Sequence, residues 1–148
     1  MTSIKDFSIR EAVTSDANAI WRLNNNEMGY QYPLEDTVQN MTKLLSSSAD
    51  KIFVAVLDGS VVGYVHANNY DLLYAPHMKN IMGIAVSSEY KQKGIGRALL
   101  QQVENWARET GASGIRLVSG AIRTDAHAFY RSCGYSGNKE QINLKKLF

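Results

Sequence analysis

The chain has 148 residues, of which 45% are hydrophobic and 20% charged, with a formal net charge of +2. These values are typical of one soluble globular domain with its own core, and the small net charge argues against nucleic acid as the main partner. The single cysteine, Cys133, excludes an internal disulfide, and no cluster of Cys and His suggests a metal site. With neither a signal-peptide pattern nor an apolar stretch long enough to span a membrane, we expect one cytoplasmic domain over residues 1–148.

The first part of the sequence predicts one strand and two helices. Apolar residues alternate with polar ones over residues 7–12, which predicts a strand. Thr14 or Ser15 offers an N-cap for a helix that ends before Gly29. Apolar residues at helical spacing predict a second helix over residues 34–45.

A hairpin and further strands are expected in the middle of the chain. Residues 52–57 form an almost unbroken apolar run, and the following Asp58-Gly59 pair is a strong signal for a two-residue hairpin turn. The other expected elements are a return strand over 61–68, a loop over 69–77, a strand over 79–86, a strand over 115–118, a helix from Asp125 to Gly134 and a last strand over 140–147. Hairpins joining most strands, with helices between them, predict an α/β (α+β) fold: a mixed, mostly antiparallel sheet with helices on both faces.

The stretch from Ile84 to Leu100 combines an apolar strand, a basic turn and the start of an amphipathic helix. Helical spacing places Leu99, Leu100, Val103, Trp106 and Ala107 on one apolar face of this helix. Gly94 and Gly96 allow the turn backbone to approach a ligand closely, and the start of a helix presents N–H groups and partial positive charge. We therefore interpret this stretch as a site for a phosphate or pyrophosphate. Full positive charges are added by Lys91, Lys93 and Arg97.

Two common phosphate-binding motifs do not fit this turn. A P-loop requires Lys and Ser or Thr after its last glycine, but Arg97 and Ala98 follow Gly96. A dinucleotide-binding turn requires a third glycine at the position of Leu99. A turn whose glycines serve only the bend remains the alternative.

The segment Lys91-Gln92-Lys93-Gly94-Ile95-Gly96 resembles the Gln/Arg-x-x-Gly-x-Gly/Ala turn of the GNAT superfamily of acetyl-CoA-dependent N-acetyltransferases, although Lys91 replaces the first Gln or Arg. Downstream, Ala126, Phe129 and Tyr130, followed by Gly134-Tyr135, resemble the family's Ala-x-x-Phe-Tyr and Gly-Phe/Tyr pattern. A helix that packs Ala126, Phe129, Tyr130 and Cys133 into a core explains the same spacing.

The resemblance implies an acetyltransferase with acetyl-CoA as co-substrate, no metal, and Tyr130 as the general acid that protonates the departing thiolate. It implies that the cofactor lies along the strand and turn formed by Ile84, Ala85, Val86, Lys91, Gln92, Lys93, Gly94, Ile95, Gly96 and Arg97. A backbone N–H near Ile84 or Val86 would stabilise the oxyanion. Two alternatives remain: a CoA-binding sensor or interaction module without turnover, and a protein that binds another nucleotide.

The resemblance also places an amine acceptor between residues 27–32 and 70–77, with Glu27, Tyr30, Tyr32, Asp71 and His77 as its candidate ligands. The acceptor is a small-molecule amine, such as an aminoglycoside or a polyamine, or a peptide amine. Because residues 79–86 contain no carboxylate, the general base stays open between a water relay, Glu27, Asp71, His66 and His77. A homodimer formed through the terminal strand also stays open.

Overall fold

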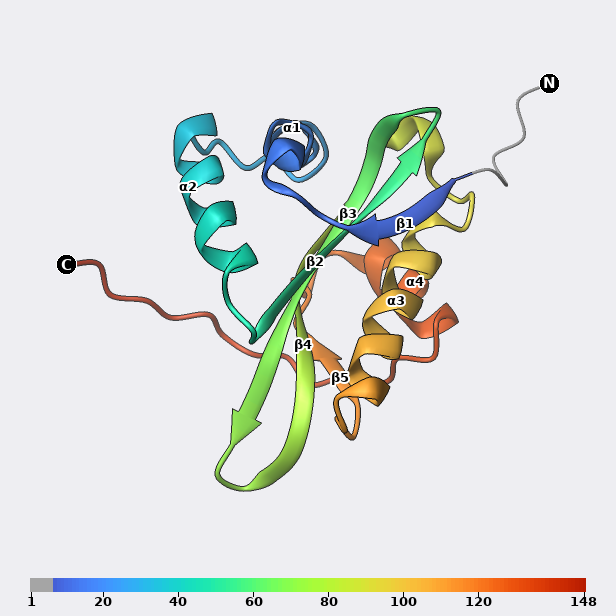
Figure 1. Cartoon of the computed structure of the whole chain (residues 1–148). Helices are drawn as coiled ribbons and strands as arrows, with labels where there is room; N and C mark the ends of the chain where they lie inside the picture. The colour runs from blue at the N-terminus through green and yellow to red at the C-terminus, as the bar shows by residue number, and fades with distance from the viewer. Residues whose placement is uncertain (1–6) are drawn as a thin grey trace. The chain divides into compact units, whose positions relative to one another are not determined.

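The computed structural model describes residues 7–148 (Figure 1) and divides at Leu117 into two compact units, Met1–Leu117 and Val118–Phe148. The first unit contains a five-stranded sheet of order β1-β2-β3-β4-β5. Its elements are β1 (Ser8–Glu11), α1 (Ala17–Glu27), α2 (Leu34–Leu45), β2 (Asp50–Leu57), β3 (Ser60–Leu72), β4 (Ala75–Val86), α3 (Ile95–Glu109) and β5 (Ile115–Leu117), with short 3-10 turns at Thr14–Asp16 and Ser88–Tyr90. The second unit contains α4 (Thr124–Ser132).

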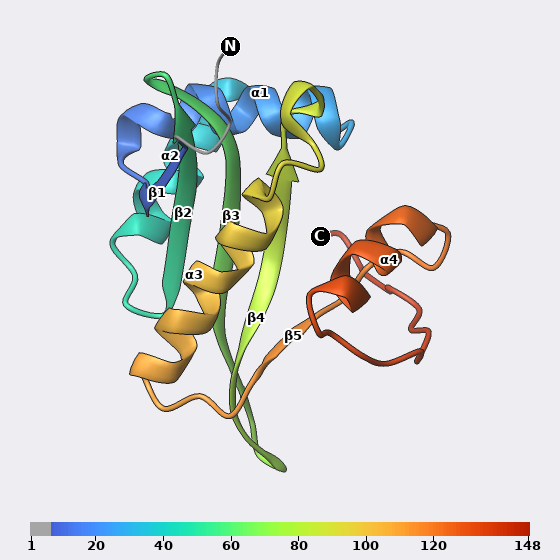
Figure 2. The ribbon, with the colours of Figure 1, turned by 90° about the vertical axis from the view of Figure 1, so that its right-hand side faces the viewer.

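The sheet is covered on both faces, with α1 and α2 on one side and α3 on the other (Figures 1 and 2). Strands β1 to β4 pair antiparallel, whereas β5 runs parallel to β4. The side chains of successive residues of β2 point to opposite faces of the sheet, and those of Ile52 and Val54 join the core under α1 and α2. The predicted mixed, mostly antiparallel sheet between helices is therefore confirmed.

Helix α3 buries the face that the sequence predicts. Leu99, Leu100, Val103, Trp106 and Ala107 are all buried. The helix starts close to the sheet because the facing strand residue is a glycine: a Cβ added there, at position 63, would lie 3.3 Å from the Ile95 side chain. This close packing sets the position of the helix N-terminus beside the end of β4.

The β3–β4 hairpin is longer than predicted, and the expected loop over residues 69–77 is wrong. β3 continues to Leu72 and β4 begins at Ala75, joined by the exposed residues Leu73 and Tyr74. The polar residues of this extension lack the apolar alternation that identifies a half-buried strand. Backbone pairing continues regardless of this pattern, because a ladder needs only partner N–H and C=O groups.

The predicted last strand over residues 140–147 is also wrong. The described chain after residue 135 contains no helix or strand, and Ile142 and Leu144 are each 86% exposed. Their alternation with polar residues specifies which side chains would share a face, but it does not provide a neighbouring strand to pair with.

None of the helices in residues 7–148 has the length and the apolar composition that a membrane span requires.

The predicted Thr14 or Ser15 cap is wrong: the N-cap of α1 is Asp16, which makes no capping side-chain hydrogen bond to the helix and instead orders the 3-10 turn before it. The side chain of Asp16 accepts a 2.8 Å hydrogen bond from Val13 N–H and two more from the Arg10 guanidinium, at 2.7 and 2.9 Å. The Arg10 hydrogen bonds hold the pKa of this buried carboxyl below its ordinary value. An ion pair thus joins β1 to the turn that precedes α1.

We predict that Asp16→Asn lowers the free energy of unfolding at neutral pH by about 1–3 kcal/mol, because charge-assisted hydrogen bonds are lost around a buried group. A carboxyl whose pKa is depressed by folding stabilises the protein above its unfolded pKa of about 3.9 and loses this effect as pH falls through its folded pKa. Urea unfolding between about pH 7 and pH 2 should therefore show a flatter pH dependence for Asp16→Asn. Asp58→Asn, in an exposed turn, is the control; parallel curves for wild type and Asp16→Asn would contradict the assignment.

Candidate functional site

Strand β4 has an open edge in its second half. β5 pairs with β4 only from Lys79 to Ile81 and ends at Leu117, whereas β4 continues to Val86. Figure 2 shows β5 leaving the side of β4. In the described part of the first unit, residues 82–86 of β4 therefore lack a strand partner on that side, and their backbone groups can pair with a ligand.

A β-bulge at Met82 changes which residues face this edge. Ile81 and Gly83 pair with consecutive residues of β3, so Met82 is the extra residue. Before the bulge, Lys79 N–H points toward β5, where it donates to Gly114 O at 3.0 Å. The bulge shifts by one residue which backbone groups point to each side of the strand. After the bulge, the N–H and C=O groups of even-numbered residues therefore point to the open edge.

The end of β4 fixes this alternation independently. Ser87 N–H donates to Val62 O at 2.8 Å, so the backbone of Ser87 faces β3. In an antiparallel ladder, hydrogen-bonded and non-hydrogen-bonded pairs alternate, so the backbone N–H and C=O groups of Ala85 also point toward β3. The N–H and C=O groups of Ile84 and Val86 then point to the open edge.

The edge leads to the N-terminus of α3. Gly94 is its N-cap, with a left-handed φ of 89°, and Gln92 has a φ of 64°. The first hydrogen bond within the helix runs from Ala98 N–H to Gly94 O, and no side chain caps the helix. The N–H groups of Ile95 and Gly96 therefore have no acceptor inside the helix. A turn with this backbone at the start of a 15-residue helix is suited to an anion.

The predicted cofactor residues differ in what they present at this turn. The side chains of Gln92 and Lys93 are exposed, whereas that of Ile95 is buried in the core. Lys91 Nζ lies 3.6 Å from a carboxylate oxygen of Glu27. Glu27 is 14% exposed at its side chain, and its other oxygen accepts Ser88 N–H at 3.0 Å. Glu27, expected to bind the acceptor, thus joins the end of α1 to the turn before α3.

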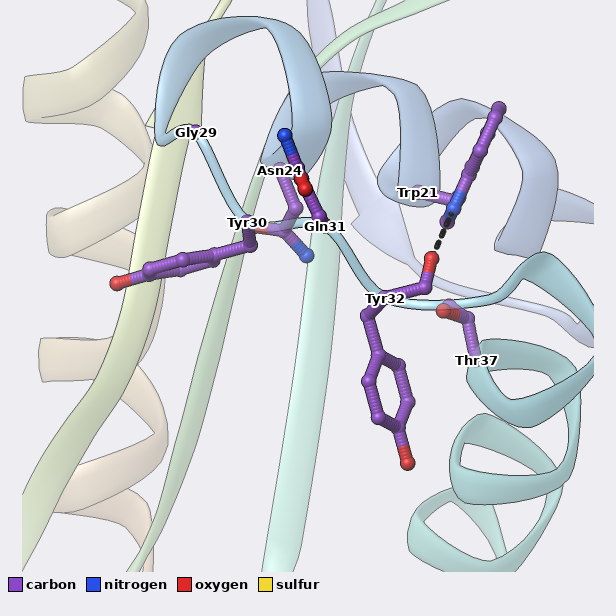
Figure 3. Close-up of a pocket in the computed structure, with 7 residues that line it drawn as sticks. All are labelled: Trp21, Asn24, Gly29, Tyr30, Gln31, Tyr32 and Thr37. Carbon is purple, nitrogen blue, oxygen red and sulfur yellow. Dashed lines mark hydrogen bonds between the residues drawn. The ribbon is translucent and has the colours of Figure 1, made fainter.

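A cavity of about 500 Å³ lies beside the α1–α2 loop (Figure 3). Trp21 Nε1–H donates to Tyr32 O at 2.6 Å, which holds the loop against α1. The rings of Tyr30 and Tyr32 extend from the loop in different directions and are 56% and 50% exposed. The lining carries no ionisable acid or base other than tyrosine: Trp21, Asn24, Gly29, Tyr30, Gln31, Tyr32 and Thr37.

Tyr64 connects this cavity to the edge strand. Its hydroxyl donates to Asn24 Oδ1 at 2.6 Å, and Asn24 lines the cavity. The same hydroxyl lies 3.2 Å from the position that a Cβ on Gly83 would take. Burial raises the pKa of Tyr64, so its phenol stays protonated as a donor. Sequence reasoning missed Tyr64 and Asn24 because their relation arises only when α1 packs on the sheet.

Asp71 and His77 are not part of this cavity. Asp71 Oδ1 and His77 Nδ1 lie 2.6 Å apart in the extended β3–β4 hairpin. His77 also contacts the Lys79 ammonium at 3.0 Å, and this buried lysine lies 4.0 Å from the Trp106 ring centroid. Burial lowers the pKa of Lys79. This network, which the sequence did not indicate, ties the hairpin to α3.

The second unit holds Tyr130 on α4. Its ring contacts Phe129 at 5.4 Å and Tyr135 at 6.3 Å between centroids. The predicted face of the helix is half-buried, and burial raises the pKa of Tyr130. Nearby in sequence, Ser119 Oγ is buried without a hydrogen-bond partner among the described residues. No group of three His, Cys, Asp or Glu side chains in residues 7–148 is placed to hold a metal ion.

Comparison with known proteins gives one family. Residues 15–135 match the model of the "Acetyltransferase (GNAT) family". The chain is 28% identical to aminoglycoside N(6')-acetyltransferase type 1 of Stenotrophomonas maltophilia, over 93% of this chain and 92% of the relative. It is also 28% identical to N-alpha-acetyltransferase of Saccharolobus solfataricus, over 97% of this chain and 83% of that relative.

A solved structure shares the fold. AAC(6')-Iy in complex with the bisubstrate analogue CoA-S-monomethyl-acetylneamine superposes with a TM-score of 0.85 at 17% identity, covering 96% of this chain and 99% of that one.

We predict that Gly94→Ala weakens binding of coenzyme A more than tenfold, because it disturbs the turn that presents the α3 N-terminus. Gly111→Ala is the matched control, since both glycines have positive φ and open space for a Cβ. Each variant should lose about 1 kcal/mol of stability from the left-handed conformation. Calorimetric titration should therefore separate the two variants, whereas urea unfolding should not. Equal affinities would contradict an anion site at Gly94.

Proposed function

Because the chain belongs to the acetyltransferase (GNAT) family, we propose that it transfers the acetyl group of acetyl-CoA to a primary amine. The observation that carries this proposal is the open edge of β4, which leads directly to an uncapped helix N-terminus. A long ligand with amides at one end and phosphates at the other matches these backbone groups, which lie along the edge of β4 and then at the start of α3.

The two parts of this edge have different roles toward the cofactor. The N–H groups of Ile95 and Gly96, with the nearby charges of Lys93 and Arg97, receive the phosphates. The backbone of Ile84 and Val86 pairs with the amides of the pantetheine arm. A preorganised N–H at this edge also stabilises negative charge that develops on the carbonyl oxygen of the acetyl group. Acetyl-CoA supplies the activated acyl group.

Tyr130 protonates the departing thiolate. A thiol has an ordinary pKa of about 8.5 and a tyrosine one of about 10, so proton transfer between them is nearly balanced. Burial raises the pKa of Tyr130, which keeps its phenol protonated at neutral pH. The residue thus holds its proton until the sulfur becomes basic.

The cavity at the α1–α2 loop receives the acceptor amine, with Tyr30 and Tyr32 contacting its cationic form. Aminoglycosides, polyamines and peptide amines are the candidate acceptors; one relative is named an aminoglycoside acetyltransferase and another an N-alpha-acetyltransferase. His66 and Asp71 are held by Asp50 and His77, at 2.8 and 2.6 Å. We therefore assign removal of the amine proton to water in the cavity.

Calorimetric titration with acetyl-CoA tests the first step of the proposal. We expect micromolar binding of acetyl-CoA and no comparable binding of ATP. Release of free thiol with a panel of amines then tests turnover. Tight binding without thiol release from any amine would indicate a CoA-binding module instead, and binding of ATP alone would indicate a protein for another nucleotide.

Replacing Tyr130 by Phe should lower kcat by about 10²–10⁴-fold, since it removes a general acid. The dissociation constant for acetyl-CoA should stay near the wild-type value, because the phenyl ring retains the packing. Tyr135→Phe, which removes a neighbouring hydroxyl, should leave kcat close to wild type. Unchanged turnover of Tyr130→Phe across the pH range would remove Tyr130 from the mechanism.

A further inference from the structure

We propose that the acceptor carries a carboxylate in addition to its amine, and that Arg116 of β5 binds this carboxylate. The inference rests on the proposed acetyl transfer and narrows its substrate class. It favours short peptides and ω-amino acids over polycations such as aminoglycosides and polyamines.

Arg116 lies on the same face of the sheet as the acceptor cavity. Its partner in the β4–β5 ladder is Asn80. The Arg116 guanidinium lies over the ring of Tyr70 on β3, 4.4 Å from the ring centroid. Tyr70 and Tyr64 lie an even number of residues apart on β3, so their side chains point to the same face of the sheet. The Tyr64 side chain joins the core under α1 and α2. Arg116 and Tyr70 are therefore on the α1 side of the sheet, opposite α3.

The guanidinium is held in place by neutral groups. Arg116 Nη1–H donates to Asn80 Oδ1 at 2.8 Å. The Asn80 amide is itself oriented, because its Nδ2 lies 3.4 Å from Asn68 Oδ1 and 2.9 Å from Met82 Sδ. The Tyr70 ring lies against the guanidinium and limits its movement. A half-buried, oriented arginine of this kind is prepared to bind a planar anion.

The charge of Arg116 has no counter-charge in the described part of the chain. The guanidinium contacts Asn80 and Tyr70, which are both uncharged, and the ion pairs of residues 7–148 do not include Arg116. An arginine has five N–H donors, and the hydrogen bond to Asn80 uses one. The others can form a bidentate contact with a ligand carboxylate.

Two carboxylates from the elements of this side, one in β2 and one in α1, already have partners. Asp50 pairs with His66 at 2.8 Å, and Glu27 holds Ser88 N–H and Lys91. The lining of the cavity contains no carboxylate either. A ligand with several ammonium groups would therefore bring positive charge toward Arg116 without a compensating acid in the cavity lining.

The spacing along β4 sets the size of the acceptor. Asn80, beside Arg116, precedes Ile84 by four positions, one of which is the bulge. At roughly 3.3 Å per residue, the guanidinium and the edge N–H that faces the acetyl carbonyl are on the order of 10 Å apart. Contact distances at both ends reduce this span. An amine and a carboxylate separated by several bonds, as in a dipeptide or an ω-amino acid, fit between them.

The experiment compares dipeptides with a free carboxyl terminus and the same dipeptides as C-terminal amides, with thiol release as the readout. The wild type should prefer the acids about tenfold or more in kcat/KM, mainly through KM, because a charged hydrogen-bonded contact is lost in the amides. Arg116→Met should remove this preference and leave the amides unaffected. Arg116→Lys should retain only part of it, since a lysine lacks the planar fork. Arg108→Met, which changes an exposed arginine on α3, should keep the full preference.

Equal rates with acids and amides in the wild type, an unchanged preference in Arg116→Met, or faster acetylation of aminoglycosides or polyamines than of the acids would each overturn the proposal. If Arg116→Met does not fold, Arg116→Lys and Tyr70→Leu carry the test, and both should lower the preference.

Failure of the acetyl-transfer proposal is recognised separately, as absence of thiol release from every amine. Binding of the same acids and amides to the CoA-loaded protein then decides the inference by itself. Selective binding of the acids that Arg116→Lys weakens supports a carboxylate site, and equal binding of acids and amides overturns it.

Discussion

The β-bulge at Met82 is the constraint on which the arrangement of the site depends. Without the extra residue, Gly83 and Ala85 would continue the alternation of Lys79 and present their backbone groups to the open edge. With it, Ile84 and Val86 do so, and the side chain of Ala85 joins the core under α1. One inserted residue thus lets a single strand pair with β5 in its first half and offer donors to a ligand in its second half.

The open edge and the α3 N-terminus can bind one ligand together only if the helix is held in a fixed position relative to β4. Packing of Ile95 against the glycine at position 63 places the first turn of α3 against the sheet. Glu27 holds the preceding turn through Ser88 N–H and the Lys91 ammonium. Because Glu27 is the last residue of α1, the same contact fixes the start of the loop that lines the cavity. The two regions proposed to hold cofactor and acceptor therefore share a structural support.

The sequence predicted the parts of the fold that depend on local periodicity. The buried face of α3 and the turn at Asp58-Gly59, with φ of 50° and 78°, are confirmed. It did not predict the extension of the β3–β4 hairpin, which is stabilised by backbone pairing and the buried Lys79 rather than by an apolar pattern. For the site, the glycine turn was visible in sequence, whereas the bulge was not, because a bulge is defined by the register between strands. The contact of Tyr64 with Asn24 was equally hidden, since it joins residues of different elements.

The contrast between the open edge of β4 and the sheet face under α1 suggests why one scaffold can keep its cofactor chemistry while changing its acceptor. The proposed cofactor contacts are mostly backbone groups, at Ile84, Val86 and the start of α3, and backbone groups depend little on which side chains surround them. The face under α1 is different, because there the side chains themselves, such as Asn80 and Arg116, form the surface. Substitution on this face alters charge without altering the ladder that holds the edge open. An uncompensated arginine among neutral neighbours is therefore informative about the acceptor of this chain in a way that the shared fold is not.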